Sequence, residues 1–557
     1  MKSKMHNSPY IFLIFIFALV KVDSVSAQKT YTNPIIPSDY SDPDVIRVGN
    51  DYYMTSSSFN MVPGLPILHS KDLVNWTTIG HGIQKVPDAF YTYSNRNKDE
   101  LDYDLPRPGK GVWAPCIRYH EGYFWIFWAD PDAGVYMVKA KKAEGPWSEP
   151  HLVKKVQGWI DTSPLWDKET GRAWLAHAYA ASRLGFNSKI AVAEMNWEGT
   201  ELFSEDKIVF DANDREKFPA DRTHRVIEGC KFMKRNGYYY ILSPAGGVPM
   251  GWQTALRSKY PDRSYEIKVV CEKGNTNING PHQGGLVDTP NGEWWFAHFQ
   301  SVNVLGRIVL LQPVKWENDW PMIGIDRDGN GIGNPVMEYT MPNTGKNGEL
   351  FSIQRSDEFS GGSLGLQWQW PSNLGSEYCT QQKGELLIKS YASSELSIHD
   401  APNTITQMFP DFKFTATAKV KVVGSGHSVT RGGLSVMGKT CFDIGIENSN
   451  GNLSLSVRHG NERDTAVVID GNELFLKLEA NGYHPLPLQF EGEENRGQVY
   501  CQFSYSYDGN SFHPLGRKFK ATAGVWIGAR VGLYCVSKEQ DQSYLLVDNF
   551  SVNTKPN

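Results

Sequence analysis

The sequence predicts an all-β protein with two domains, a five-bladed β-propeller followed by a β-sandwich of jelly-roll type. Three observations support this prediction. The chain has 557 residues, whereas a single hydrophobic core stops growing at roughly 250 to 300 residues. Aromatic residues make up 12% of the chain and stand beside 52 glycines, a balance typical of turn-rich β structure. One hairpin pattern also recurs five times before residue 320.

The first 27 residues predict a secretory signal peptide. Lys2 and Lys4 precede an apolar run from residue 10 to residue 20, and small residues up to Ala27 mark a cleavage site. The apolar run is too short to span a bilayer. Because no cysteine lies near the cleavage site, we expect no membrane anchor. We therefore expect a protein that is secreted across the inner membrane and resides in the periplasm.

Charge and cysteine content exclude several classes of protein. The formal net charge is −5 and no basic block occurs, which argues against a nucleic-acid partner. The seven cysteines are widely spaced and include no CxxC pair. We therefore expect buried free thiols rather than a zinc site or a dense disulfide framework.

Five similar hairpins organise the first domain, which we place at residues 28–340. Each combines a polar, glycine-containing turn with strand-like aromatic residues. The turn glycines lie 49 to 73 residues apart, a spacing that suits one four-stranded antiparallel sheet per repeat. They are Gly49, Gly122, Gly171, Gly237 and Gly292. The alternative is an ordinary β-sandwich with aromatic-rich strands.

A chemically distinctive residue precedes each turn glycine by seven to ten positions, where the first strand of each repeat begins. These residues are Asp42, Trp113, Asp161, Glu228 and His282. The first strands of propeller blades surround the central axis, so we expect these side chains to converge on one funnel. Three carboxylates there would provide an acid and a base for glycoside hydrolysis, and a third charge that raises the pKa of the acid.

The second domain is placed at residues 350–557. A stretch rich in Pro, Asn and Gly from residue 341 to residue 349 marks the boundary. Beyond it, short alternating strands and turns without helical periodicity predict the sandwich. No catalytic set stands out in this domain. Trp368 and Trp370 could bind glycan or shape the propeller pocket, although such residues more often belong to a core.

Six stretches, taken together and in order, resemble glycoside hydrolase family 43. They are SDPDVIRVGNDYYMTSSSF, LPILHSKDLVNW, GVWAPCIRYHEGYFWIFWAD, IDTSPLW, IEGCKFMKRNGYYYILSPAGG and GPHQGGLVDTPNGEWWFAHF. The resemblance covers about residues 31–325, and the C-terminal part resembles the β-sandwich of many members. The whole chain is similar to secreted Bacteroides arabinofuranosidases that debranch hemicellulose, including xyloglucan. This resemblance implies an inverting, exo-acting enzyme for plant cell-wall oligosaccharides that requires no cofactor.

The resemblance also assigns roles. It makes Asp42 the general base, Glu228 the general acid, and Asp161 the residue that tunes and orients the acid. Asp44 is the rival for Asp42, and Asp39 is interpreted as a turn residue. The positions that match substrate-binding residues are Phe59, Trp113, His282 and Arg307. Some relatives hold a structural cation near the axial histidine, and we assign no metal here.

Three functions remain under consideration. The first is release of terminal α-L-arabinofuranose from xyloglucan or arabinoxylan side chains. The alternative is β-D-xylosidase activity on xylo-oligosaccharides. A non-catalytic carbohydrate-binding propeller is the third, and the three carboxylates argue against it because a binding module needs no matched acid and base.

Overall fold

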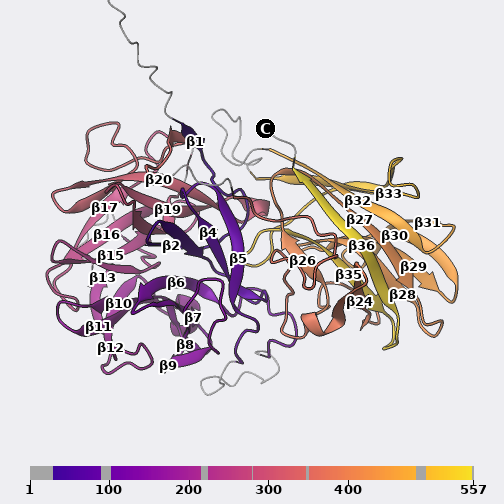
Figure 1. The fold of residues 1–557 in the computed structure, drawn as a ribbon, viewed down its shortest axis with the longest axis horizontal. Coiled ribbons are helices and arrows are strands. Elements are labelled where there is room, and N and C mark those ends of the chain that lie inside the picture. The colour runs from indigo at the N-terminus through magenta and orange to yellow at the C-terminus, as the bar shows by residue number, and fades with distance from the viewer. Residues whose placement is uncertain are drawn as a thin grey trace, which may run out of the picture.

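The computed structural model describes residues 29–88, 102–214, 224–276, 278, 280–345, 351–483 and 497–554. Within these residues the protein is almost entirely β, and the propeller and the sandwich lie side by side (Figure 1). The predicted fold class is therefore confirmed. The predicted signal peptide lies outside the described residues.

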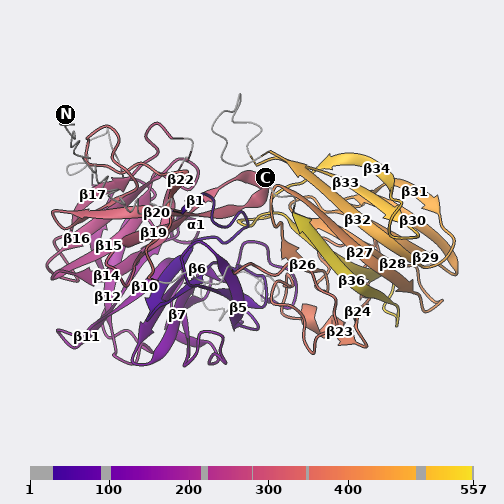
Figure 2. The ribbon, with the colours of Figure 1, turned by 45° about the horizontal axis from the view of Figure 1, so that its top comes forward.

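The propeller consists of five four-stranded antiparallel sheets, each formed from four consecutive strands (Figure 2). Blade 1 is β2 (Asp44–Val48), β3 (Asp51–Thr55), β4 (Gly64–Ser70) and β5 (Trp76–Ile83); blade 2 is β6 (Trp113–His120), β7 (Tyr123–Asp130), β8 (Gly134–Ala140) and β9 (His151–Lys155); blade 3 is β10 (Trp159–Asp167), β11 (Arg172–Tyr179), β12 (Lys189–Met195) and β13 (Lys207–Asp211); blade 4 is β14 (Lys231–Arg235), β15 (Tyr238–Ala245), β16 (Trp252–Ser258) and β17 (Glu266–Cys271); blade 5 is β18 (His282–Asp288), β19 (Trp294–Ser301), β20 (Arg307–Glu317) and β21 (Trp320–Ile323).

The five predicted turn glycines each connect the first two strands of a blade. All five have positive φ, from 65° at Gly49 to 85° at Gly292. Glycine adopts this backbone region without the steric penalty that a Cβ brings. The recurring glycines are therefore explained by the hairpin turn, and they mark the start of each blade correctly.

The ring closes between blade 1 and blade 5. Arg47 of β2 forms an ion pair with Asp288 of β18 (2.6 Å). Tyr31, in β1 (Thr30–Thr32), donates its hydroxyl to the carbonyl of Leu311 in β20 (2.8 Å). β1 also pairs with β22 (Glu338–Thr340), which follows the last blade. The N-terminal segment thus fastens the two ends of the propeller together.

The sandwich has two seven-stranded sheets. One has the order β23-β24-β36-β27-β32-β33-β34, and in the other β25-β35-β28-β29-β30-β31 are joined by β26, which pairs with β35. The strands are β23 (Cys379–Gln382), β24 (Glu385–Lys389), β25 (Tyr391–Ala392), β26 (Ile405–Met408), β27 (Lys413–Val423), β28 (Thr430–Met437), β29 (Phe442–Ser449), β30 (Asn452–His459), β31 (Glu462–Val468), β32 (Glu473–Gly482), β33 (Val499–Ser506), β34 (His513–Lys520), β35 (Arg530–Ser537) and β36 (Tyr544–Thr554).

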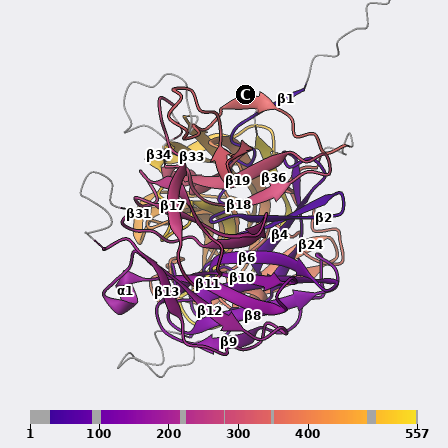
Figure 3. The ribbon, with the colours of Figure 1, turned by 90° about the vertical axis from the view of Figure 1, so that its left-hand side faces the viewer.

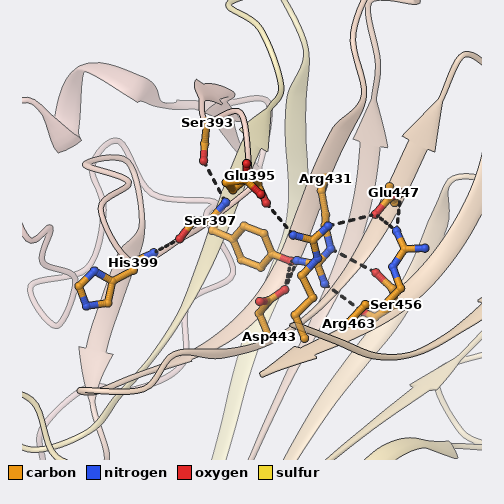
Figure 4. A network of polar contacts seen from close by, with 11 residues as sticks. Ser393, Glu395, Ser397, His399, Arg431, Asp443, Glu447, Ser456 and Arg463 are labelled. Carbon is orange, nitrogen blue, oxygen red and sulfur yellow. Dashed lines mark hydrogen bonds and ion pairs between the residues drawn. The ribbon is translucent and has the colours of Figure 1, made fainter. Parts of the chain in front are cut away.

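The second sheet carries a buried polar network on the face away from the sandwich core. In β28, Leu434 and Val436 belong to the core, while Arg431 contacts Asp443 of β29 and the hydroxyl of Tyr534 in β35. Arg431 also donates to the carbonyl of Ser456 in β30 (2.9 Å). Figure 4 shows this arginine surrounded by its partners. A guanidinium with these partners can be buried without an unpaired charge.

The two domains share one continuous apolar core. A single cluster of buried side chains includes Ile126 of the propeller, Trp368 and Trp370, and residues throughout the sandwich. Trp370 and Val62 exchange two backbone hydrogen bonds of 2.6 and 2.9 Å. Figure 3 looks from the propeller side, with the sandwich directly behind it. Trp368 and Trp370 are therefore core residues that join the domains.

The cysteines and the few helices are unremarkable. All seven cysteines are free thiols and six are buried, as expected from their spacing. The short helical segments are α1 (Ala181–Leu184), η2 (Asn303–Leu305) and η3 (Gly375–Tyr378). Among the described residues, no helix is long and apolar enough to cross a membrane.

Candidate active site

At or just before the start of the inner strand of each blade, one residue at an equivalent position has a positive φ. The five are Asp42 (φ 54°), Ala114 (36°), Asp161 (59°), Gly229 (71°) and Gln283 (35°). In β6, β10 and β18 this residue lies at a bulge, where the pairing with the following strand shifts in register. A bulge re-aims a side chain, and positive φ in residues other than glycine is uncommon and costly. Asp42 and Asp161 occupy this position itself, whereas Trp113, Glu228 and His282 precede it by one residue.

A pocket of about 240 Å³ lies where these strands meet. Six of the seven predicted site residues line it: Asp42, Phe59, Trp113, Asp161, Glu228 and Arg307. The pocket thus gathers residues from blades 1, 2, 3, 4 and 5. The convergence expected from the hairpin repeat is present for all three carboxylates.

Asp42 is held by two donors. Nη1 of Arg307 lies 2.7 Å from Oδ1, and the Ser57 hydroxyl donates to Oδ2 at 2.6 Å. Ser57 is itself fixed, since its Oγ accepts the backbone N–H of Ala114 (2.7 Å). A carboxylate with a charged donor on one oxygen and a hydroxyl on the other is held in one orientation toward the pocket.

Asp44, the rival for Asp42, does not line the pocket. Its Oδ2 accepts hydrogen bonds from Nη1 of Arg118 (2.7 Å) and from the backbone N–H of Ile117 (2.8 Å). The positive charges of Lys231 and Arg118 lower its pKa against the effect of burial. Asp44 is therefore a structural carboxylate that connects blade 1 to blade 2.

Asp161 lies next to Glu228. Its Oδ2 accepts the backbone N–H of Gly229 (2.7 Å), the residue that directly follows Glu228. Burial raises the pKa of Asp161, and the negative charge of Asp42 raises it further. The hydrogen bond fixes the backbone that carries Glu228.

Glu228 is half-buried at the pocket wall. Burial raises the pKa of its carboxyl well above the usual range, and the negative charges of Asp161 and Asp42 add to this rise, against a lowering by Arg307. A carboxyl in this environment keeps its proton at neutral pH. The pocket thus contains a carboxyl disposed to remain protonated, Glu228, and a second carboxyl group, Asp42, that is oriented by Arg307 and Ser57. This pair suits acid/base chemistry.

The walls are aromatic. The rings of Phe59 and Trp113 lie 6.3 Å apart in an edge-to-face arrangement, and Trp113 contacts Trp526 in the same manner at 6.4 Å. The guanidinium of Arg183 lies over Trp113 at 5.5 Å. Flat ring faces of this kind suit the apolar faces of sugars.

Trp526 comes from the sandwich and was missed by sequence reasoning. It lines the pocket although 53% of its surface is exposed. Nothing in its local sequence distinguishes it from a surface residue, because its role depends on how the sandwich docks. Other pocket residues that carried no sequence signal are Tyr179, Ser182, Asn187 and Gln283.

Asp39 attaches the loop that carries Trp526. Its Oδ2 accepts the backbone N–H of Gly528 (2.8 Å), and its Oδ1 accepts the backbone N–H of Arg307 (2.8 Å) and the Ser41 hydroxyl (3.1 Å). A Cβ on Gly306 would lie 2.4 Å from this Oδ1, so the site needs glycine there. Asp39 is buried, and its interpretation as a turn residue was wrong.

His282 does not line the pocket. It is fully buried, its ring lies 5.5 Å from that of Phe299, and neither ring nitrogen has a hydrogen-bond partner among the described residues. Burial lowers its pKa to about 3. No group of three or more His, Cys, Asp or Glu side chains in the described part of the chain is arranged to hold a metal ion. Direct sugar contact by His282 therefore has no support from its position.

Family comparisons match both domains. Residues 31–321 match the model of glycosyl hydrolases family 43, and residues 356–553 match the model of the β-xylosidase C-terminal concanavalin A-like domain.

The similar proteins are glycosidases by name. A protein of Xylanibacter ruminicola, provisionally named a β-xylosidase, is 37% identical over 90% of this chain and 86% of its own. A β-xylosidase of Formosa agariphila is 30% identical over 94% of this chain and 90% of its own. A non-reducing end α-L-arabinofuranosidase of Bacteroides ovatus is 29% identical over 82% of each chain. A solved family 43 protein of Bacillus licheniformis superposes with a TM-score of 0.76 at 25% identity, over 94% of this chain and 99% of that one.

Proposed function

Because this chain belongs to glycosyl hydrolase family 43, we propose that it is an exo-acting, inverting glycosidase that releases one terminal pentose from hemicellulose oligosaccharides. The observation that carries this proposal is the pocket that combines Asp42, Asp161 and Glu228. Its volume of about 240 Å³ lies below the roughly 300 Å³ at which pockets for larger ligands begin, which favours one sugar ring.

Asp42 accepts a proton from the attacking water in this mechanism. Glu228 donates its proton to the glycosidic oxygen, so that the aglycone leaves as a neutral alcohol. The water oxygen bonds to the anomeric carbon from the face opposite to the leaving group, which inverts its configuration. Arg307 orients Asp42 through its hydrogen bond, and the negative charge of Asp161 helps to keep Glu228 protonated.

We place β-D-xylose first among the pentoses. The order differs from the expectation drawn from sequence, because two relatives with β-xylosidase names cover 90% and 94% of this chain at higher identity than the arabinofuranosidase. Release of α-L-arabinofuranose is the second candidate, and the Bacteroides ovatus relative supports it.

A side-by-side assay tests the choice. We expect kcat/KM for nitrophenyl β-D-xyloside to exceed that for nitrophenyl α-L-arabinofuranoside. Glu228→Gln should lose most of its activity on xylobiose, whose leaving group needs a proton. Proton NMR of the first product formed should show the inverted anomer. A higher kcat/KM on the arabinofuranoside would reverse the order, and a retained anomer would contradict the mechanism.

The location and cofactor requirement also stay proposals. We propose that the enzyme acts in the periplasm on oligosaccharides of plant cell walls and needs no metal for catalysis. Cell fractionation tests the first point. Activity that survives dialysis against a chelator supports the second, and activity that disappears and returns with one cation contradicts it.

A further inference from the structure

A second pocket, of about 250 Å³, lies at the junction of the two domains. It shares a wall with the active-site pocket, since Val525 lines the second pocket and Trp526 lines the first. A Cβ on Gly109 would lie 2.6 Å from Val525 Cγ1 and 3.0 Å from Trp526 Cδ1. The two pockets are therefore adjacent but separated by packed backbone and side chains.

The lining of this junction pocket differs from that of a sugar site. Its apolar surface comes from Met61, Pro106, Pro108, Pro371, Met437 and Ile527. Within the described chain no Phe, Tyr or Trp and no carboxylate lines it, and its one ring is the imidazole of His399. A sugar ring would bring several hydroxyls into this apolar surrounding without enough partners. A flat apolar body with few polar groups fits better.

Two cationic side chains line the pocket, the exposed Lys439 and the buried Arg530. Arg530 is only 4% exposed, and its guanidinium donates to two neutral groups, the hydroxyl of Thr406 (2.8 Å) and the amide oxygen of Gln369 (2.7 Å). Among the described residues Arg530 forms no ion pair. The charge of Asp39 acts on it without a hydrogen bond, and the oxygens of Asp39 accept from Arg307, Ser41 and Gly528. Burial lowers the pKa of Arg530 to about 10. An anion in the pocket would offset the cost of burying this charge.

Two buried polar atoms at the junction pocket lack partners. Oδ1 of Asn60 and Oγ1 of Thr404 form no hydrogen bond in the described structure, and both residues line the pocket. Their residues are 4% and 0% exposed. Buried polar atoms are satisfied in most proteins, so two unsatisfied ones at one pocket indicate a missing partner. Asn60 Oδ1 can only accept, and so requires a donor on the ligand.

We propose that the junction pocket binds a one-ring arylcarboxylate that carries a hydroxyl group. The carboxylate pairs with Arg530 and is attracted by Lys439, an exposed lysine among the lining residues. The ring packs on the methionine and proline side chains, and the hydroxyl satisfies Asn60 or Thr404. This assignment depends on the pocket alone and not on which pentose the enzyme releases.

Calorimetric titration of the full chain with 4-hydroxycinnamate tests the proposal. We expect a dissociation constant below about 1 mM, and binding at least roughly 10-fold weaker for the neutral methyl ester, because the ester cannot pair with Arg530. Arg530→Gln should abolish binding, and Lys439→Glu should weaken it about 3-fold without touching the interior. Lys520→Glu, an exposed change on β34 outside the lining residues, is the matched control, and its affinity for 4-hydroxycinnamate should be unchanged.

Hydrogen exchange locates the ligand. Bound 4-hydroxycinnamate should protect residues 404–406 and 524–527, but not residues 179–187 of the active-site pocket. Equal affinity for acid and ester, unchanged affinity in Lys439→Glu, or displacement of the acid by xylose would overturn the proposal. If Arg530→Gln fails to fold, the ester and Lys439→Glu still decide the outcome.

Discussion

Asp42, Asp161 and Glu228 have the same titrating group but different surroundings. Asp42 receives a hydrogen bond from Arg307 and another from Ser57. For Glu228, burial raises the pKa most, and the repulsion from Asp161 outweighs the attraction of Arg307. Charge pairing favours ionisation, and burial with like charges favours protonation. The difference in environment, rather than in residue type, separates base from acid.

The effect of the leaving group on kcat/KM tests whether Glu228 is the general acid. Glu228→Gln should lose roughly 10²- to 10⁴-fold in kcat/KM on xylobiose, whose sugar leaving group needs a proton, and much less on a nitrophenyl glycoside, whose phenolate leaves unaided. Steady-state kinetics on the two substrates measures this. Glu194→Gln, which removes the ion pair with Arg172 on blade 3, is the control, and its kcat/KM on both substrates should be close to that of the unchanged enzyme. Equal losses on both substrates would show that Glu228 is not the acid.

The alkaline limb of the pH profile tests Asp161. Glu228 must be protonated to act, so activity falls as pH rises through its raised pKa. Asp161→Asn removes a negative charge that helps to raise this pKa, so the fall in kcat/KM should begin at lower pH, by roughly one unit. Asp211→Asn, on the outer strand of the same blade, should leave the limb in place. A limb that stays or moves to higher pH in Asp161→Asn would contradict the assignment.

Among the structural elements, the loop that carries Trp526 depends on a single propeller carboxylate. Asp39 accepts three hydrogen bonds, from Ser41, Arg307 and Gly528. Asn in its place would present an NH₂ group to one of these donors, and leaving a buried donor unsatisfied costs about 1 to 3 kcal/mol. Asp39 thus positions Arg307 and Trp526 without touching the sugar.

Asp39→Asn should therefore raise KM on the order of 10-fold and speed hydrogen exchange in residues 522–529. Trp526→Ala should raise KM as well. In the double variant the rise in KM, expressed as a free energy, should be smaller than the sum of the two single effects, because both changes act through one loop. Asp51→Asn is the control, because Asp51 pairs with His69 and Lys71 in the outer part of blade 1. Full additivity together with unchanged exchange would show that Asp39 has no such role.

The polar network of the second sandwich sheet makes a separate prediction. Arg431→Met leaves Asp443 buried without its charge partner, and breaking a buried pair in this way costs about 3 to 5 kcal/mol. Urea unfolding of the sandwich should show this loss. Arg463→Met breaks the half-exposed pair with Glu447 and should cost less than about 1 kcal/mol. Similar effects of the two changes would contradict the distinction between buried and exposed pairs.

At the scale of the whole molecule, the propeller and the sandwich behave as one body because their cores are continuous. Backbone pairing between Val62 and Trp370 adds hydrogen bonds to this apolar contact. A protease site inserted between residues 345 and 351 should give two fragments that stay together in gel filtration and remain active. Fragments that separate in native buffer, with a fully active propeller half, would contradict this view.

The sequence by itself determined the blades and the three carboxyl groups that line the pocket. The turn glycines are local features, because a hairpin needs positive φ whatever surrounds it, and their repetition places Asp42, Asp161 and Glu228 at the starts of inner strands. Local geometry and a fivefold repeat are sufficient to bring these residues to one axis. The resemblance to a family then supplied their roles.

Only the tertiary structure decided how the pocket is completed. Asp39 and Gly528 are 489 residues apart, and nothing near either residue encodes their hydrogen bond. From sequence, Trp526 resembles a surface residue and His282 is predicted to bind substrate. In the structure Trp526 lines the pocket, whereas His282 is fully buried and does not line it. Contacts between domains depend on the shapes of two complete surfaces, and no periodicity in a single chain records how those surfaces meet.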